Sequence, residues 1–324
     1  YVPVSGDGSS WSAGALDQWI ADVHASGIQI NYTADGSTTG RNNFILGQSD
    51  FAASDIPFQT SPGDGSPPEH PQAGSYAYMP ITAGGTVFMY NLKINGQRVT
   101  NLRLSGANVT KIFTGAITNW NDPALAADNP GLRLPNQSIT PVVRSDGSGT
   151  TNNFTKYLAA TAPAQWTYGN AKEWKAPGGL GAKGNDGVAA AIKSTDNAIG
   201  YIELSFAQDA ALKVASVDNG AGAVEPTSQN AAAAITKATR AGTGNDLKLN
   251  LDYTIKEANT YPIVLVTYEI TCQKGLPSKD LALTKSFLTY TASDAAQNGL
   301  TDSGYVPITG DLLTDVRSAV ASLA

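Results

Sequence analysis

One stretch near the middle of the chain constrains the fold more than any other. Residues 139–143 (ITPVV) are mostly β-branched and predict a strand. Arg144 follows, and then the small polar residues 145–151 (SDGSGTT). Apolar side chains within residues 154–158 (FTKYL) recur at helical spacing. The pattern therefore predicts a strand, a Gly/Ser loop and a helix start, which is the basic unit of an α/β fold.

A loop of this kind has the chemistry of an anion site. The first turn of a helix presents unpaired backbone N–H groups and the positive end of the helix dipole. Glycine lets the backbone come close to a ligand. The hydroxyls of Ser148, Thr150 and Thr151 add donors, and the planar guanidinium of Arg144 suits a tetrahedral oxyanion. The loop therefore predicts binding of an oxyanion.

The same arrangement recurs twice nearer the N-terminus. Residues 2–4 predict a strand before the loop 5–10 (SGDGSS), and a helical apolar pattern runs from Trp11 to Val23. Residues 28–32 predict a second strand, followed by the loop 35–40 (DGSTTG) and a short helix. A single Gly/Ser loop is usually a plain connection. Three such loops, one of them preceded by an arginine, indicate a shared anion site.

A carboxylate ends the next apolar run. Asp55 closes the segment 50–54 (DFAAS) and stands two residues before Pro57. If Asp55 faces the same pocket, a carboxylate aimed at an anion makes sense only if the anion carries a proton. Phosphate carries one near neutral pH and sulfate does not. Two plainer interpretations stay open: Asp55 as a helix N-cap, and Arg144 with Asp146 as a surface ion pair worth ~0–1 kcal/mol.

Taken together, these segments resemble a known family. The chain is similar to the phosphate-specific substrate-binding proteins of bacterial ABC importers, within the periplasmic-binding-protein superfamily. The resemblance extends over almost the whole length. Besides the four segments above, it rests on residues 111–122 (KIFTGAITNWND), 181–188 (GAKGNDGV), 198–203 (AIGYIE) and 261–263 (YPI).

The resemblance implies an architecture. We expect an α/β chain with the two-lobe periplasmic-binding-protein fold (type II), a ligand cleft between the lobes and two crossing hinge strands. Alternating strands and helices predict mostly parallel sheets. With crossing strands expected at 86–91 and 261–272, the first lobe would comprise residues 1–84 and 264–324, and the second residues 85–263.

Two further segments complete the expected architecture. The loop of Arg144 would lie in the second lobe, and the other three segments in the first. Residues 61–76 (SPGDGSPPEHPQAGSY) are rich in Pro, Gly and Ser and predict an exposed loop.

The resemblance also implies the residues of the phosphate site. Asp55 would accept the proton of the phosphate and so reject sulfate, and Asp146 would orient Arg144 from outside the contact shell. The family usually has Phe at the position of Trp11, but a backbone N–H contact should survive that change. The expected phosphate ligands are Ser10, the N–H of Trp11, Ser37, Asp55, Arg144, Ser148, the N–H of Gly149, and Thr150.

Charge and composition restrict the partners. The formal net charge is -6, so the anion would be held by a local field and not by overall attraction. No basic stripe is present, which argues against nucleic acid. No apolar run of about 18 residues occurs, so we expect membrane contact only through an anchor or a permease.

The expected partners are therefore inorganic phosphate and the transmembrane subunits of an ABC permease. We expect a monomer with no cofactor and no metal. The expected location is extracytoplasmic, either periplasmic or, in a Gram-positive bacterium, secreted or anchored at the cell surface.

The residues also bear on other function classes. A phosphatase or serine hydrolase would need catalytic histidines or a His/Asp metal cluster, yet only His24 and His70 exist and neither has a catalytic context. A surface sensor or adhesion protein on the same fold stays open, because a fold does not fix a function. Arsenate, which shares the shape and protonation of phosphate, stays open as a second ligand.

Overall fold

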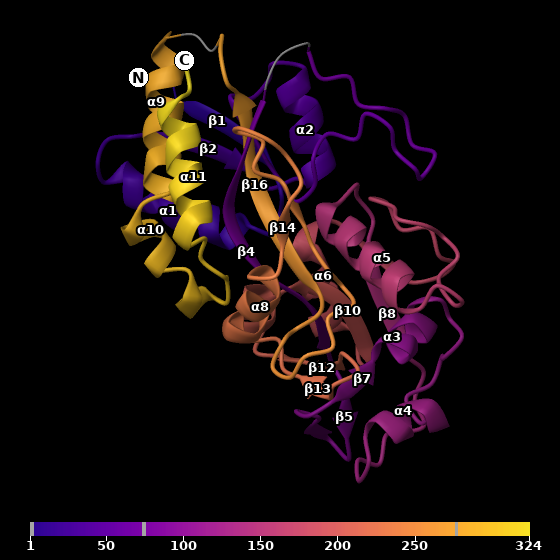
Figure 1. Cartoon of the computed structure of the whole chain (residues 1–324). Coiled ribbons are helices and arrows are strands. Elements are labelled where there is room, and N and C mark those ends of the chain that lie inside the picture. Colours follow the sequence, from indigo (N-terminus) through magenta and orange to yellow (C-terminus); the bar gives the residue numbers. More distant parts are fainter. Residues whose placement is uncertain (1–2, 73–75, 276–277) are drawn as a thin grey trace.

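The computed structural model describes residues 3–72, 76–275 and 278–324, and shows an α/β chain built around one mixed sheet (Figure 1). In this part of the chain the sheet has nine strands in the order β2-β1-β3-β16-β4-β10-β8-β9, with β11 also paired to β4. The strands are β1 (Val4–Gly8), β2 (Ile30–Thr33), β3 (Phe51–Ser54), β4 (Tyr76–Tyr90), β8 (Thr140–Arg144), β9 (Leu180–Ala182), β10 (Ala198–Glu203), β11 (Lys213–Val214) and β16 (Val264–Cys272).

Within the described residues, smaller sheets lie outside this main sheet. One has the order β13-β12-β7, and two are two-stranded pairs. Their strands are β5 (Lys93–Ile94), β6 (Gln97–Arg98), β7 (Arg103–Ser105), β12 (Ser216–Asp218), β13 (Ala223–Val224), β14 (Thr239–Arg240) and β15 (Leu249–Asn250).

The main sheet is parallel at its two ends and antiparallel in its centre. β1 pairs in parallel with β2 and β3, and β8 pairs in parallel with β10 and β9. β16 is antiparallel to β3 and β4, and β4 is antiparallel to β10. The prediction of mostly parallel sheets was therefore right for the two ends and wrong for the centre. The chain leaves the first parallel group along β4 and returns along β16, so these long strands run in opposite directions.

Strand β4 belongs to both ends of the sheet. Its residues 76–85 pair with β16, and its residues 86–90 pair with β10. The crossing strand predicted at 86–91 is thus the second part of a longer strand that begins at Tyr76. Nearly every residue of β4 is buried, because the strand is covered on both faces.

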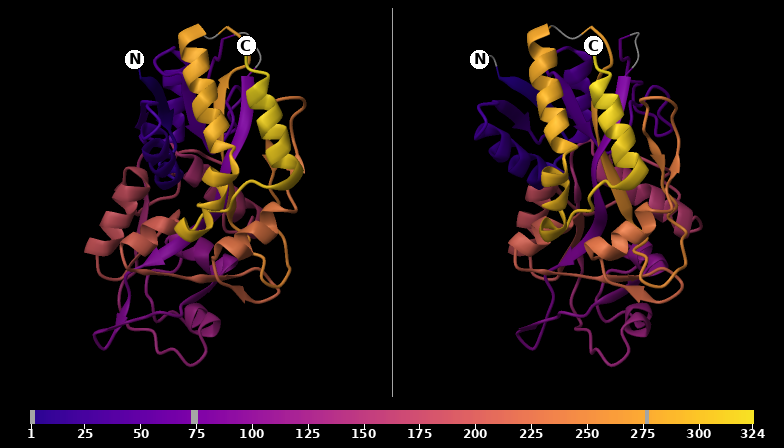
Figure 2. Two further views of the ribbon diagram at one scale, coloured as in Figure 1. Left: turned by 90° about the vertical axis from the view of Figure 1, so that its left-hand side faces the viewer. Right: turned by 60° about the vertical axis from the view of Figure 1, so that its left-hand side comes forward.

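The helices cover the sheet and supply its core. Along α1, the buried residues Ala15, Leu16, Trp19 and Val23 form the predicted apolar face. Figure 2 shows α9 and α11 packed side by side over the part of the sheet that contains β1 and β16. The helices are α1 (Ala13–His24), α2 (Ser37–Ile45), α3 (Gly106–Phe113), α4 (Pro123–Asp128), α5 (Gly149–Thr161), α6 (Gly184–Ser194), α7 (Leu204–Asp209), α8 (Ser228–Ile235), α9 (Ser278–Thr291), α10 (Asp294–Asn298) and α11 (Gly310–Ala321), with a 3₁₀ turn at Thr301–Ser303.

Among the residues that the structure describes, three apolar clusters form the interior. One lies around β8 and β10 with α3, α5 and α6, and the other two lie on opposite faces of β3, β16 and β4. Ala231, Ala234 and Leu247 lie outside the predicted first lobe, yet they pack in the same cluster as Val264 of β16 and Val316 of α11. The division of the chain into lobes stays a prediction.

The Pro-rich segment (residues 61–72) is exposed or half-buried, as predicted, except at Glu69. Glu69 is only 6% exposed, and its two carboxylate oxygens accept bonds of 2.7 and 2.9 Å from Nη2 and Nε of Arg41. Nζ of Lys172 lies 3.6 Å from Oε1 of Glu69, and the Lys172 N–H donates to Asp64 at 3.5 Å. Buried charges need such partners. The exposed-loop prediction is therefore confirmed for most of residues 61–72 and wrong at Glu69. Its residues 73–75 lie outside the described ones, and Tyr76 begins β4.

Within the described residues, no helix is both long and apolar enough to cross a membrane.

Candidate functional site

Four helix N-termini meet at the carboxyl ends of the parallel strands. α1 and α2 follow β1 and β2 at one end of the sheet, and α5 and α6 follow β8 and β9 at the other. The sequence pattern predicts three of these loops, whereas the fourth, at Gly184, is part of the family resemblance alone. Since helix N-termini offer unpaired N–H groups, their convergence creates a site for a negatively charged group.

Asp55 lies directly after β3 and receives three hydroxyl hydrogen bonds. Its Oδ1 accepts from Ser9 and Thr267, both at 2.7 Å, and its Oδ2 accepts from Ser37 at 3.1 Å. Burial raises the pKa of the Asp55 carboxyl, although the hydroxyl donors and the charge of Arg144 act in the opposite direction. A buried carboxylate with a raised pKa attracts a proton strongly. Asp55 can therefore accept a hydrogen bond from a protonated anion.

Arg144 and Asp146 form a buried ion pair at the end of β8. Arg144 is 2% exposed, and its Nε donates to Asp146 Oδ1 at 2.7 Å while its Nη2 donates to the other oxygen. Burial acts to raise the pKa of Asp146, but the hydrogen bonds and charge of Arg144 hold that pKa below its usual range. The surface-pair interpretation is thus wrong, and the role of Asp146 in orienting Arg144 for a ligand stays a prediction. The remaining Nη1 donates to Thr150 Oγ1 at 3.1 Å.

Ser148, Gly149 and Thr150 start α5. Ser148 is the N-cap, and its hydroxyl accepts from the Thr151 N–H at 3.1 Å. Gly149 faces Asp55 so closely that an added Cβ would lie 2.4 Å from the Asp55 Cβ, which only glycine avoids. The first amides of a helix lack intrahelical acceptors, so this turn presents N–H donors beside Asp55.

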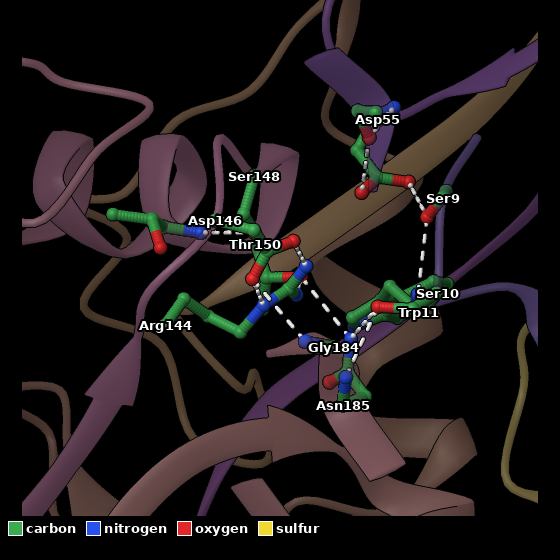
Figure 3. A network of polar contacts seen from close by, with 12 residues as sticks. Ser9, Ser10, Trp11, Asp55, Arg144, Asp146, Ser148, Thr150, Gly184 and Asn185 are labelled. Carbon is green, nitrogen blue, oxygen red and sulfur yellow. Dashed lines mark hydrogen bonds and ion pairs between the residues drawn. The ribbon is translucent and has the colours of Figure 1, made fainter. Parts of the chain in front are cut away.

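Contacts also join the loops of the two ends of the sheet. The Ser10 hydroxyl accepts from the Asn185 N–H and from Asn185 Nδ2, both at 3.0 Å. The N–H of Thr38, in the first turn of α2, donates to the Gly147 carbonyl at 3.3 Å. Figure 3 shows Asp55, Ser9 and Ser10 on one side of this network, Arg144 and Thr150 on the other, and Asn185 below, between the two groups.

The structure thus brings the predicted site residues into one region, but it changes details. Strand β1 continues to Gly8, beyond the predicted end at Val4, and α2 begins at Ser37 itself. The backbone N–H of Trp11 donates to the Ser9 hydroxyl at 3.1 Å. The assignment of Ser10 and Trp11 as ligands stays a prediction, as it does for Ser37, Asp55, Arg144, Ser148, Gly149 and Thr150.

Sequence reasoning missed three residues of this network. Ser9 and Thr267 donate to Asp55, and Asn185 contacts Ser10 and Thr150. Only Asn185 had a usable signal, since residues 180–185 repeat the order of strand, glycine and helix. Among the described residues, no group of three or more His, Cys, Asp or Glu side chains could hold a metal ion.

Comparisons with known proteins identify relatives along most of the chain. Residues 2–295 match the family described as the PBP superfamily domain. Phosphate-binding protein PstS 3 of Mycobacterium tuberculosis is 39% identical over 324 residues, which cover 98% of this chain and 85% of the relative. Phosphate-binding protein PstS of Xylella fastidiosa is 34% identical over 329 residues, covering 99% and 85%.

Solved structures give the same fold. A high-affinity periplasmic phosphate-binding protein (PfluDING) bound with phosphate superimposes with a TM-score of 0.76 at 20% identity, covering 98% of this chain and 93% of the other. A substrate-binding protein of a putative phosphate ABC transporter from Clostridium perfringens, with bound phosphate, gives 0.65 at 18% identity, covering 95% and 100%. These similarities support the two-lobe fold predicted from the sequence.

Proposed function

Because the chain belongs to the PstS-like phosphate-binding proteins of the periplasmic-binding-protein superfamily, we propose that it captures inorganic phosphate outside the cytoplasm and delivers it to an ABC permease. Proteins of this family are substrate-binding proteins of phosphate transport and not enzymes. The proposed partners are phosphate and the transmembrane subunits of the permease. The protein would act as a monomer, in the periplasm or at the cell surface.

The convergence of the four helix N-termini on Asp55 and Arg144 carries this proposal. One buried arginine, partly neutralised by Asp146, would share the anion with hydroxyl and amide donors. Charge-assisted hydrogen bonds are about twice as strong as neutral ones. Ser10, Ser37, Ser148 and Thr150 would supply hydroxyls, and Trp11 and Gly149 would supply N–H groups.

Asp55 would set the selectivity. Its Oδ1 already accepts from Ser9 and Thr267, and burial raises the pKa of the carboxyl. Once the Ser37 hydroxyl turns from Oδ2 to the anion, a proton on the anion is the natural donor to Oδ2. Sulfate brings no proton near neutral pH and would face the carboxylate with a lone pair, a juxtaposition that costs several kcal/mol. The site would therefore select phosphate, and arsenate with it, partly by rejecting sulfate.

Ligand binding would couple to closure of the two lobes. We retain the proposed division into residues 1–84 with 264–324 and residues 85–263, since Ser10, Ser37 and Asp55 then lie opposite the loop of Arg144. A ligand that bridges the two groups favours the closed form only because it binds that form more tightly.

Calorimetric titration of phosphate-stripped protein tests the proposal. We expect one-to-one binding of phosphate at neutral pH and no heat from sulfate. Binding of both anions would support the anion site but refute the role of Asp55 in rejecting sulfate. Binding of neither by folded protein would refute the proposed function.

A further inference from the structure

We propose that Asn185 is a positioning residue of this site, one that forces the hydroxyls of Ser10 and Thr150 to act as donors toward the bound anion. The inference rests on the proposed function, because it concerns how the phosphate site is held ready. It gives a role to a residue of the stretch 181–188, which is part of the family resemblance but contains none of the predicted phosphate ligands.

The argument begins with the Ser10 hydroxyl. A hydroxyl has one proton to donate and two lone pairs that accept. Both the N–H and the Nδ2 of Asn185 donate to Ser10 Oγ at 3.0 Å, and Ser10 is 3% exposed. With its acceptor capacity filled by Asn185, the Ser10 hydroxyl has only its proton left to offer. It therefore suits an acceptor, such as a phosphate oxygen.

Thr150 is held in the same way. Its Oγ1 accepts from Arg144 Nη1 at 3.1 Å and from Asn185 Nδ2 at 3.4 Å. Its lone pairs too are taken, and its proton is free to point away from both donors. One amide thus sets the polarity of two hydroxyls that come from opposite ends of the sheet. Figure 3 shows Asn185 close to both Ser10 and Thr150.

Asn185 can do this because its own orientation is fixed. Its Oδ1 accepts from the Glu203 N–H at 2.9 Å, and the residue is fully buried in the first turn of α6. A backbone N–H can only donate, so this contact identifies the amide oxygen and leaves Nδ2 facing the two hydroxyls. The preceding residue, Gly184, donates its N–H to Asp146 at 3.2 Å, which ties the same turn to the partner of Arg144.

The result is a division of labour among the polar groups. The hydroxyls of Ser10 and Thr150 become donors, while Asp55 keeps its role as acceptor. Such fixed polarity means that few dipoles need to reorient when the anion arrives, and preorganisation of this kind raises affinity.

Two substitutions at one position separate positioning from plain structural support. Asn185→Asp keeps the shape and the acceptor for the Glu203 N–H, but it replaces the Nδ2 donor by an oxygen and adds a negative charge. The Ser10 hydroxyl would then turn toward the aspartate. Asn185→Ala removes the amide and leaves the hydroxyls free to rotate. We expect the phosphate Kd to rise roughly 10-fold to 100-fold for the Ala variant and further for the Asp variant.

Asn91→Ala is the matched control. Asn91 is 3% exposed, and its Nδ2 donates to the carbonyls of Ile192, Lys193 and Thr195 at the other end of α6, at 3.1 to 3.2 Å. Its loss should weaken the same helix without touching the site. We expect a lower unfolding temperature for this variant and an unchanged phosphate Kd.

Titration calorimetry with inorganic phosphate, together with thermal unfolding in its absence, tests whether Asn185 positions the hydroxyls or only supports the structure. The proposal requires that phosphate affinity falls from the parent to Asn185→Ala and falls further in Asn185→Asp. It also requires that Asn91→Ala binds phosphate as tightly as the parent. A milder effect of Asp than of Ala, or an affinity loss in the Asn91→Ala variant, would overturn it, since both are what structural support alone predicts. If the folded parent bound no phosphate, the proposed function itself would fail, a result distinct from either.

Discussion

The substitution Asp55→Asn tests the chemistry of selection most directly, because it removes one charge and keeps the shape. In the parent, Oδ1 holds the hydroxyls of Ser9 and Thr267 and Oδ2 faces Ser37. An asparagine can keep both contacts at Oδ1. At the second position an N–H₂ group replaces the acceptor, and the Ser37 hydroxyl, which already accepts from the residue 55 N–H at 3.3 Å, must rotate.

The expected magnitudes follow from these contacts. Phosphate loses one charge-assisted hydrogen bond to its proton, which is worth about 1.5–3 kcal/mol. Sulfate loses a like-charge contact that costs several kcal/mol and gains an amide donor. A site that uses a substrate proton discriminates by about 10⁴-fold or more. We therefore expect the preference for phosphate over sulfate to fall by at least about 10³-fold, mostly through tighter binding of sulfate.

The assay is competitive calorimetry at neutral pH, in which sulfate is titrated first and phosphate second. Asp146→Asn gives a useful comparison, since it also removes a buried carboxylate, but one that faces Arg144 and not the proton of the ligand. That variant should lose affinity and retain the preference. An Asp55→Asn protein that excludes sulfate as well as the parent does would refute the gating role of Asp55.

Three further predictions concern buried charges. Arg144→Ala should weaken phosphate binding by ~2–5 kcal/mol in calorimetry, because it leaves Asp146 buried without its cation; unchanged binding would place Arg144 outside the site. Lys172→Met should lower the free energy of unfolding in urea by ~1–3 kcal/mol, because Glu69 loses one of two cationic partners; no change would show that the contact contributes nothing. Burial raises the pKa of Glu269 to about 8, and the neighbouring Thr291 hydroxyl offsets only part of that rise. Its folded-state pKa lies above the unfolded value, so the stability it contributes at low pH is lost as the pH rises to about 8. Glu269→Gln should therefore flatten the decline in urea stability between about pH 5 and about pH 9, and an unaltered slope would contradict this.

The local pattern of the chain predicted the loops of the site well. Strand, small residues and helix follow one another within a few positions around Arg144, so short-range chemistry decides that geometry. Asp55 was found for a related reason, as a charged residue at the end of an apolar strand. The family resemblance added the two-lobe architecture, which local pattern alone does not determine.

What the sequence concealed depends on distant partners. Ser9 and Ser10 are chemically identical, and only the course of the backbone after β1 turns Ser9 toward Asp55 and Ser10 toward Asn185. Asn185 matters because it meets a residue 175 positions earlier in the chain. Glu69 is buried by Arg41, 28 positions away, within a segment whose composition predicts exposure.

The continuity of β4 has a mechanical consequence. The strand passes without a break from its pairing with β16 to its pairing with β10, and Gly84 and Gly85 lie where the partner changes. A continuous strand bends by small changes of twist that are spread over several residues, whereas a flexible loop can rotate about a few bonds. We therefore expect the loops that follow β1, β2 and β3 to separate from the loops that follow β8 and β9 through only a small angle. Bending β4 would produce an elastic torque that opposes this separation. A permease that empties the site would have to supply work against that torque as well as against the hydrogen bonds to the anion.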